Sequence, residues 1–268
     1  QKKDDEMKVL LTGASGGVAT MIRPLLRSAY SEVVLSDREA PTELQAGETF
    51  IAAELGDPEQ VLSAMQGVDG VIHLGGQSVE AAWPVVLESN IVGLYNVYEA
   101  ARQAGVARIV FASSNHAVGF YPRDQTIDHT VPVKPDTRYG VSKAFGEAMG
   151  ALYAHKHGLK VTDLRIGNVG FEPLDKRRLS IWLHPEDLVQ LIRIGLEHPD
   201  IEHETWYGAS DNARGWWDNR RAEQMGYKPK FQSEVFAAAI LARPEKGDPV
   251  AEKYQGGTFC ADEYTHKK

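Results

Sequence analysis

The stretch Thr12-Gly13-Ala14-Ser15-Gly16-Gly17-Val18-Ala19 decides the fold of this chain. It follows a short apolar run, 7–12, and leads into a segment with helical periodicity, 16–29. Glycines at such a junction let the backbone turn sharply and approach a pyrophosphate, which binds the free N–H groups of a helix N-terminus. The stretch therefore predicts a cofactor-binding loop made by Gly13, Ala14, Ser15, Gly16, Gly17 and Val18.

Strand-like and helix-like segments alternate along most of the chain. Apolar and β-branched runs predict strands at 7–12, 33–36, 49–53, 71–74, 109–113, 161–166 and 205–208. Helical patterns predict helices at 16–29, 58–65, 80–104, 139–157 and 185–197. We therefore expect an α/β protein with a doubly wound parallel sheet of Rossmann type and a small C-terminal substrate lobe. The expected division is a nucleotide-binding domain at 7–170 and a substrate-binding lobe at 171–268, with some elements of the lobe returning to the sheet.

Composition limits the function classes. The formal net charge of −8 argues against a protein that binds the phosphate backbone of nucleic acids. The single cysteine, Cys260, excludes an internal disulfide framework and a cysteine-based zinc site, and it fits a reducing compartment. No apolar run approaches the ~18 residues that span a bilayer, and the polar start, 1–6, does not resemble a signal peptide. We expect a soluble, cytoplasmic protein with no bound metal and no nucleic-acid or membrane partner.

Asp37 indicates which dinucleotide the loop would bind. It ends the predicted second strand, 20 residues after Gly17, where an acidic side chain meets the ribose hydroxyls of the adenosine. Because a carboxylate repels a 2′-phosphate, this position favours NAD over NADP. Arg38 follows directly and weakens the preference slightly.

The same loop also matches G-x-S-x-G, the nucleophile-elbow pattern of α/β-hydrolases, with Ser15 as the nucleophile. An elbow serine follows a central strand well inside the chain. Here the serine follows the first strand, so no upstream segment could supply the oxyanion loop. The pattern therefore favours the nucleotide-binding interpretation.

The segment Tyr139-Gly140-Val141-Ser142-Lys143 predicts a catalytic pair on a helix. Residues four apart share one helix face, so the Lys143 ammonium can lie near the Tyr139 phenol. A free tyrosine has a pKa of ~10, and a nearby cation favours the phenolate that a general base needs. Ser114, at the end of the fifth predicted strand, can hold the substrate oxygen against the phenol. The alternative is a surface Tyr–Lys pair without catalytic function.

These motifs together resemble the extended short-chain dehydrogenases/reductases, also called the NAD-dependent epimerase/dehydratase family. The similar stretches run over most of 7–210 and include 90–97 and 164–169. The resemblance implies Ser114, Tyr139 and Lys143 as a catalytic triad and NAD as the cofactor. It also implies cofactor contacts from Tyr139, Lys143, Leu74, Gly75, Gly76, Asn90, Glu54 and Leu55. The family usually has Asp-Leu where this chain has Glu54-Leu55, which puts that contact in doubt.

Four stretches resemble uronate dehydrogenases in particular, at 73–80, 113–116, 216–219 and 254–259. The resemblance implies oxidation of the C1 hemiacetal of galacturonate or glucuronate by a homo-oligomeric enzyme. It implies substrate contacts from Ser78, Ser114, Asn115, His116, Tyr139, Asn168 and Arg177.

Arg177 would bind the C6 carboxylate through its planar fork of donors, with Arg178 and Lys176 as alternatives. Arg177 could instead lie in a solvated basic loop, and His116 could be a buried, hydrogen-bonded histidine. Two other functions stay open. One is a nucleotide-sugar epimerase or reductase, disfavoured by the short C-terminal lobe, and the other is a non-catalytic NAD sensor, disfavoured by the Tyr139–Lys143 pair.

Overall fold

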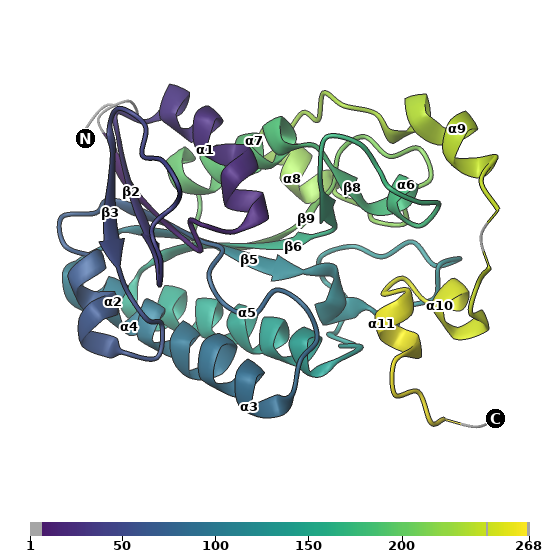
Figure 1. Ribbon diagram of the computed structural model, residues 1–268, viewed down its shortest axis with the longest axis horizontal. Helices are drawn as coiled ribbons and strands as arrows, with labels where there is room; N and C mark the ends of the chain where they lie inside the picture. The colour runs from purple at the N-terminus through teal and green to yellow at the C-terminus, as the bar shows by residue number, and fades with distance from the viewer. Residues whose placement is uncertain (1–6, 245, 267–268) are drawn as a thin grey trace.

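The computed structural model describes residues 7–244 and 246–266 and has a seven-stranded parallel sheet at its centre (Figure 1). The strand order is β3-β2-β1-β4-β5-β6-β9, and the strands are β1 (Lys8–Thr12), β2 (Glu32–Asp37), β3 (Glu48–Ala52), β4 (Gly70–His73), β5 (Arg108–Ser114), β6 (Lys160–Ile166) and β9 (His203–Gly208). A separate two-stranded sheet pairs β7 (Asn168–Val169) with β8 (Trp182–Leu183). The polar start of the chain, 1–6, lies outside the described residues.

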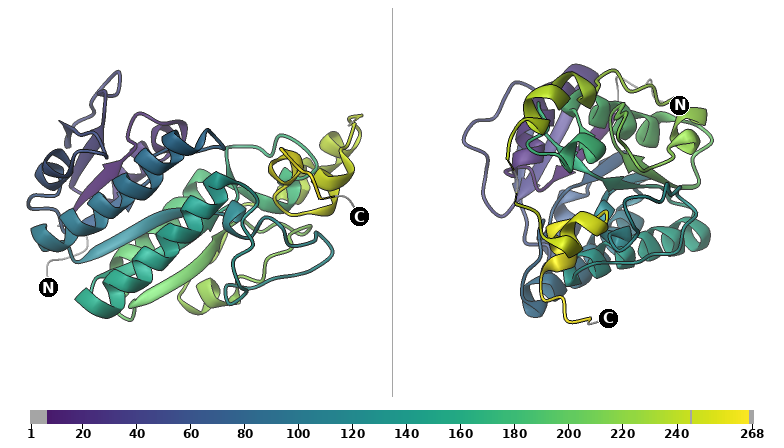
Figure 2. Two further views of the ribbon diagram at one scale, coloured as in Figure 1. Left: turned by 90° about the horizontal axis from the view of Figure 1, so that it is seen from below. Right: turned by 90° about the vertical axis from the view of Figure 1, so that its right-hand side faces the viewer.

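Helices cover both faces of the large sheet (Figures 1 and 2). One face carries α1 (Gly17–Ala29) and α7 (Pro185–Glu197), and the other carries α2 (Pro58–Ala64), α4 (Gly93–Ala104) and α5 (Arg138–His157). The shorter helices are α3 (Trp83–Val86), the π-helix η2 (Leu87–Val92), the 3-10 helices η3 (Asn115–Val118) and η4 (Ser233–Phe236), α6 (Arg178–Ile181), α8 (Arg220–Gln224), α9 (Ala237–Leu241), α10 (Pro249–Lys253) and α11 (Thr258–Ala261). Of the helices in the described ranges, none is both long and apolar enough to cross a membrane.

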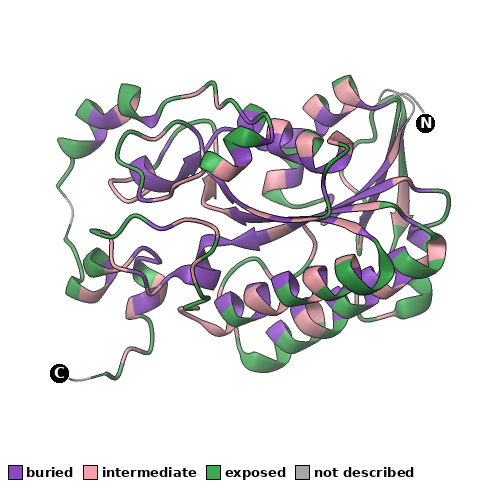
Figure 3. Cartoon of the chain, turned by 180° about the vertical axis from the view of Figure 1, so that it is seen from behind, coloured by how far each residue is buried: buried purple, intermediate pink, exposed green. Residues whose placement is uncertain are grey.

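Strand residues alternate between two hydrophobic cores because successive side chains of a strand point to opposite faces. In β1, Val9 and Leu11 pack beneath α1 and α7, whereas Leu10 packs against α2, α4 and α5. All three side chains are fully buried. Figure 3 shows the same pattern, with buried strands between helices whose outer faces are exposed. Burial on both faces is typical of parallel sheets in α/β proteins and confirms the predicted fold class.

The strand order creates a crevice at the carboxyl ends of β1 and β4. From β1 the chain moves outward to β2 and β3, and β4 then returns to pair with the other side of β1. A ligand in an open α/β sheet binds at such a reversal of strand order. The glycine loop after β1 and the loop after β4 both lie at this crevice.

The predicted continuous helix at 80–104 is wrong at its start. Helical structure begins at Trp83, and η2 interrupts it before α4. Pro84 fits the first turn, where a missing N–H costs no hydrogen bond. Glu80 lies outside the helix because its carboxylate binds the start of α5, accepting from Tyr139 N at 2.8 Å.

The C-terminal segment returns to the sheet and then reaches its carboxyl end. Strand β9 pairs with β6 along residues 161–166, and α7 packs over the sheet near β5. The last helices, α10 and α11, lie beyond the carboxyl ends of β5 and β6 (Figure 1). The sequence patterns predict β9 and α7, but they miss β7, β8, α6 and α8 to α11.

Candidate active site

A cleft of about 860 Å³ lies at the carboxyl ends of β1, β2, β3 and β4. Most of the residues predicted to bind the cofactor line it, namely Gly13, Ser15, Gly16, Gly17, Val18, Asp37, Glu54, Leu55, Leu74, Gly75 and Gly76. Ala14 does not line it, because this residue is fully buried and its N–H donates to Ser36 O at 3.3 Å. The cleft can therefore hold an extended ligand that runs from β4 across the glycine loop to β2.

Gly13 allows the loops after β1 and β4 to approach each other. Its φ of +67° lies in the left-handed region, and a Cβ here would lie 2.8 Å from Gly75 N. Thr12 adds a hydrogen bond, because its hydroxyl accepts from Gly75 N at 3.1 Å. Any side chain at position 13 would therefore push the two loops apart and widen the crevice.

The N-terminus of α1 presents backbone donors to the cleft. Its N-cap, Gly16, supplies no side-chain hydrogen bond, and no acidic residue lies in the first turn. A Cβ on Gly17 would meet no atom within 4 Å, so the space over the first turn is open. Free N–H groups and the helix dipole make such an end suitable for a pyrophosphate.

Asp37 lies beside the glycine loop at the end of β2. Its carboxylate accepts from Ser15 N at 3.0 Å and from Arg38 N at 2.8 Å. These bonds hold the carboxylate at the edge of the cleft. The position agrees with the predicted contact to the adenosine ribose, while Arg38 is exposed.

Tyr139, Lys143 and Ser114 come together at the junction of β5 and α5. The N-cap Thr137 accepts from Gly140 N at 3.0 Å and fixes the start of α5, which places Tyr139 in its first turn. Ser114 ends β5, and its hydroxyl lies close enough to the Tyr139 phenol to act against the rise in the phenol's pKa. One turn along α5, the Lys143 ammonium lies 5.4 Å from the centre of the Tyr139 ring and donates to Ala112 O at 2.7 Å.

Burial dominates the electrostatics of the Tyr139–Lys143 pair. Burial raises the pKa of Tyr139 to about 12, and the Ser114 hydrogen bond opposes this shift. Burial also lowers the pKa of Lys143 to about 8. Because both side chains are buried, removal from water disfavours both charged forms. The lowering of the phenol pKa by Lys143 together with a positive nicotinamide stays a prediction.

Asn115 and Arg177 are hydrogen-bonded to each other. Asn115 Oδ1 accepts from the Arg177 guanidinium at 3.0 Å, and its amide donates to Ile166 O at 3.0 Å. Arg177 Nε donates to Gln255 O at 2.8 Å. Burial, followed by the nearby charges of Arg123 and Arg178, lowers the pKa of Arg177 to about 10. Arg177 is thus held by protein contacts rather than solvated in a loop.

Arg178 and Lys176, the cations on either side of Arg177 in the chain, have other partners. Arg178 forms an ion pair with Asp175, in the same loop. Lys176 also has an interaction within the chain. Arg177 is the cation whose guanidinium bonds Asn115, next to Ser114 in the chain.

Ser78, Asn168 and Asn90 occupy distinct places around the cleft. Ser78 is exposed and lines the cleft in the loop after β4. Asn168 is half-buried in β7, opposite Trp182. Asn90, in η2, bonds both backbone groups of Gln77, accepting from N at 2.8 Å and donating to O at 2.9 Å. Its amide also donates to the Ser142 hydroxyl at 3.0 Å, so this side chain joins the β4 loop to α5.

Four residues that sequence analysis missed support the predicted ones. Asp136 binds His116, Glu80 binds the start of α5, and Gln255 and Phe259 contact Arg177 and His116 from the C-terminal segment. The stretch 254–259 carries a resemblance in sequence, which is the one signal that could have indicated the last two. Nothing in the described part of the chain forms a group of three or more His, Cys, Asp or Glu side chains suited to a metal ion.

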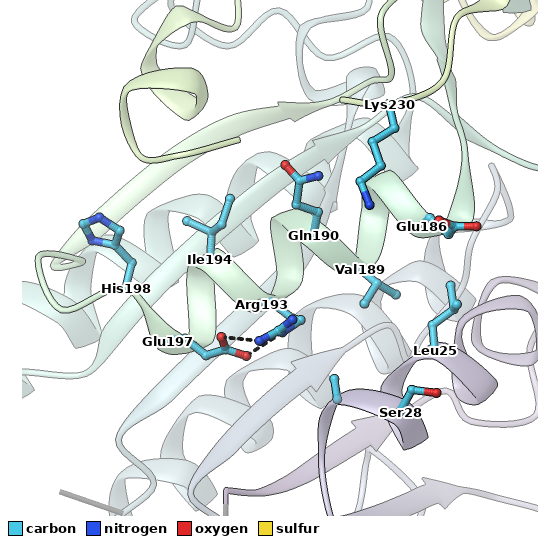
Figure 4. A pocket seen from close by; sticks show the side chains of 11 residues that line it. Leu25, Ser28, Glu186, Val189, Gln190, Arg193, Ile194, Glu197, His198 and Lys230 are labelled. Atoms are coloured by element: carbon cyan, nitrogen blue, oxygen red, sulfur yellow. Dashed lines mark hydrogen bonds and ion pairs between the residues drawn. The ribbon is translucent and has the colours of Figure 1, made fainter. Parts of the chain in front are cut away.

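A second hollow, of about 520 Å³, lies between α1 and α7 on the outer face of the molecule (Figure 4). Its charged side chains include Arg193 and Glu197, which bond each other at 2.8 Å. Tyr30 also donates to Glu197 at 2.7 Å. These partners leave the Glu197 carboxylate engaged, and the hollow is remote from the carboxyl ends of the strands. The cleft at the carboxyl ends of β1 to β4 is therefore the better candidate for a functional site.

A Rossmann-type sheet, a glycine loop at its crevice and a Tyr–Lys helix beside it define a dinucleotide-dependent oxidoreductase. Residues 9–170 match the NAD dependent epimerase/dehydratase family, and the chain belongs to that family.

Similarity extends beyond the family level. A uronate dehydrogenase of Pseudomonas putida is 45% identical over 256 residues, which cover 94% of this chain and 95% of that protein. The crystal structure of uronate dehydrogenase from Agrobacterium tumefaciens matches with a TM-score of 0.92 at 39% identity, covering 96% of this chain and 97% of that one. A mutant of the Agrobacterium enzyme complexed with NAD matches with a TM-score of 0.92 at 38% identity over the same shares. The predicted resemblance to uronate dehydrogenases is confirmed.

Proposed function

We propose that this protein is an NAD-dependent dehydrogenase that oxidises the C1 hemiacetal of a hexuronic acid, galacturonate or glucuronate, to an aldarolactone. The observation that carries the proposal is the position of Arg177. Its guanidinium bonds Asn115, the residue that follows the catalytic candidate Ser114. A cation beside the reacting groups distinguishes a uronate from its parent hexose, because the two sugars differ only in the carboxylate at C6.

Tyr139 is the general base of the proposed reaction. The anomeric hydroxyl lies between Ser114 and Tyr139, and the phenolate takes the hydroxyl proton as C1 is oxidised. NAD, when bound, accepts the hydride and places a positive charge near the phenol, which favours the phenolate. Lys143 lies over the ring and supports the same charge. Ser114, whose hydroxyl lies near the phenol, holds the substrate oxygen in place.

The cleft residues fit NAD by their chemistry. The N-terminus of α1 offers backbone donors for a pyrophosphate, and Asp37 offers a carboxylate for ribose hydroxyls. Glu54, Leu55, Leu74, Gly75 and Gly76 line the same cleft. We propose contacts from these residues and from Asn90, which positions the β4 loop through Gln77.

Substrate recognition is assigned to residues at the edge of the sheet. We propose that Arg177 binds the C6 carboxylate through donors not used by Gln255 and Asn115. Ser78, Asn115, His116 and Asn168 then contact the sugar hydroxyls. This assignment makes 7–170 the cofactor-binding part of the chain and 171–268 the part that completes the substrate site.

A reduction assay tests the proposal directly. The purified protein is mixed with NAD and a panel of galacturonate, glucuronate, galactose, glucose and UDP-sugars, and NADH is followed by absorbance. We expect turnover with the uronic acids and little with the neutral sugars. Turnover restricted to UDP-sugars would identify a nucleotide-sugar enzyme instead. NAD binding without turnover on any sugar would favour a non-catalytic sensor.

We also propose that the enzyme is cytoplasmic and forms a homo-oligomer. Large apolar side chains are exposed along α3, η2, α4 and α5, namely Trp83, Val85, Leu87, Val92, Tyr95, Val141 and Leu152. A second copy of this chain packed on these helices would bury that surface. Light scattering coupled to gel filtration gives the mass of the assembly. A monomer at micromolar concentration would contradict this part of the proposal.

A further inference from the structure

Asp136 has a buried carboxylate next to a predicted substrate residue, and neither the sequence motifs nor the proposed mechanism uses it. Its side chain has 0% exposure, and Oδ2 lies 2.6 Å from His116 Nδ1. Oδ1 accepts from the Thr137 hydroxyl at 3.0 Å. The Cys260 sulfur lies 3.8 Å from Oδ2 and is closer to Gly119 O, at 3.3 Å. A carboxylate offers only acceptor atoms. The imidazole therefore donates to it, which places the histidine proton on Nδ1.

The surrounding backbone leaves room for this carboxylate and little else. Gly119, Gly140 and Gly256 come from three separate segments, and a Cβ on any of them would meet the Asp136 carboxylate. For Gly140 the separation from Oδ1 would be 3.1 Å, and for the other two the overlap would be greater. Three chain segments thus enclose the Asp136 side chain and fix its direction toward His116.

Two aromatic side chains also fix the orientation of the His116 ring. It stacks on Phe259 with ring centres 4.0 Å apart and planes 18° apart. Tyr139 lies against it edge-on at 5.9 Å. Burial lowers the pKa of His116, and the bond and charge of Asp136 only partly offset this shift. The ring is therefore neutral near pH 7, with Nδ1 engaged by Asp136.

The second nitrogen of the ring is left for a ligand. Across residues 7–244 and 246–266, His116 Nε2 has no hydrogen-bond partner from the protein, and the side chain keeps 11% exposure. A neutral imidazole with its proton on Nδ1 carries a lone pair on Nε2 and accepts one hydrogen bond. Tyr139 lies against the ring, and Asn115, the residue before His116, is bonded to Arg177.

We propose that Asp136 is a positioning residue that determines specificity by fixing His116 as an acceptor for one hydroxyl group of the substrate. The proposal rests on the proposed function, because that hydroxyl belongs to the uronate. An acceptor at this point selects a sugar with a free hydroxyl and rejects a deoxy analogue, since the analogue leaves Nε2 buried and unpaired. Asp136 acts through His116 and does not touch the substrate.

The first test measures the histidine tautomer and does not depend on activity. Protein labelled with ¹⁵N-histidine is studied by long-range ¹H–¹⁵N correlation spectra, with His116→Ala to assign the signals. We expect a protonated Nδ1 and an unprotonated Nε2 for His116. In Asp136→Asn the amide can donate as well as accept, so the proton should shift in part to Nε2. A wild-type His116 protonated on Nε2, or spectra unchanged in Asp136→Asn, would overturn the proposal.

The central sheet provides a matched control. Asp163 has a side chain with 0% exposure and binds His203 Nε2 at 2.8 Å, in the middle of β6. Asp163→Asn therefore makes the same chemical change at another buried Asp–His pair. It should leave the His116 signals and the turnover of uronate unchanged. Equal effects of both variants on His116 would indicate a general loss of structure and would count against a specific role for Asp136.

The second test uses substrate analogues. kcat/KM is measured for galacturonate and for its analogues lacking one ring hydroxyl each. Because an unpaired buried acceptor costs about 1–3 kcal/mol, wild type should disfavour one deoxy analogue by roughly 5- to 150-fold. His116→Ala and Asp136→Asn should both reduce that preference, with Asp163→Asn as the control. An unchanged preference in both variants would overturn the inference. Absence of uronate turnover in wild type would instead overturn the proposed function, and the tautomer spectra would still decide the role of Asp136.

Discussion

At the scale of single residues, the phenol of Tyr139 is the group whose chemistry depends most on its surroundings. Burial raises its pKa to about 12, which favours the neutral phenol. We expect Tyr139→Phe to lower kcat by ~10²-fold or more, because the change removes the general base. NAD affinity, measured by fluorescence titration, should stay close to that of wild type. Near-normal turnover in this variant would mean that another group is the base.

Asp37 is predicted to set cofactor choice. We expect Asp37→Ala to weaken NAD use and to permit measurable NADP use, since the repulsion toward a 2′-phosphate is removed and Arg38 lies next to it. The carboxylate also accepts from Ser15 N, so part of the loss comes from a looser glycine loop. The ratio of kcat/KM for the two cofactors separates these effects. A ratio equal to that of wild type would contradict the assignment at the end of β2.

Arg177 is predicted to set substrate class. A charge-assisted hydrogen-bonded pair contributes about 1.5–3 kcal/mol, so Arg177→Ala should lower kcat/KM for galacturonate by roughly 10- to 150-fold. Trace activity on galactose should change little, because that sugar lacks the carboxylate. Arg178→Ala is the comparison, since Arg178 pairs with Asp175. Equal losses of kcat/KM on both sugars would indicate a structural role of Arg177 through Gln255 and Asn115. No loss of kcat/KM on galacturonate would mean that another residue binds the carboxylate.

At the scale of elements, local sequence patterns predicted the sheet and its major helices because alternation and capping signals are local. As predicted, α2 begins at Pro58. The helices α4 and α5 end just before Gly105 and Gly158. The loop at 80–82 was missed because its geometry depends on a bond from Glu80 to a residue 59 positions away. The roles of Asp136 and Phe259 were missed for the same reason. Contacts between residues far apart in the chain produce no periodic pattern in the sequence.

Glu80 connects the cofactor loop to the catalytic helix. Its carboxylate accepts from Tyr139 N and forms an ion pair with Arg138, which also binds Glu263 of the C-terminal segment. We expect Glu80→Ala to lower kcat several-fold, because it leaves the Tyr139 N–H without its acceptor and loosens the β4 loop. Loss of one such bond costs about 1 kcal/mol of stability. Thermal unfolding and kcat are measured beside Glu234→Ala, which removes a surface ion pair with Arg214. Equal, small effects of the two variants on kcat would mean that Glu80 does not position Tyr139.

At the scale of the whole molecule, two cores on opposite faces of one sheet hold the strands, and the carboxyl edge of the sheet carries the site. Strand β6 shows how both functions share one element. Its end leads to Asn168, and its interior carries Asp163, which is buried and bound to His203 of β9. The Asp163 Oδ1 and Tyr98 hydroxyl atoms are buried without a partner. Because the buried Asp163–His203 pair can titrate, the stability of the sheet depends on pH.

The direction of that dependence follows from the two pKa shifts. Burial raises the pKa of Asp163 to about 7, above its unfolded value of ~3.9. Burial lowers the pKa of His203, but the bond and charge of Asp163 outweigh it and leave this pKa raised. Both groups therefore bind protons more tightly in the folded state. Their stabilisation is fully present at low pH and is lost as the pH rises through about 7.

Asp163→Asn should remove most of this dependence, because asparagine keeps an acceptor for His203 and does not ionise. We expect the free energy of unfolding of the variant, relative to wild type, to increase between pH 5 and pH 8 by at least about 1 kcal/mol. Urea unfolding at both pH values measures the change. Asp57→Asn is the control, since Asp57 is the N-cap of α2 and asparagine caps a helix about as well. If the difference between Asp163→Asn and wild type were the same at both pH values, the titrating group that links sheet stability to pH would lie outside the Asp163–His203 pair.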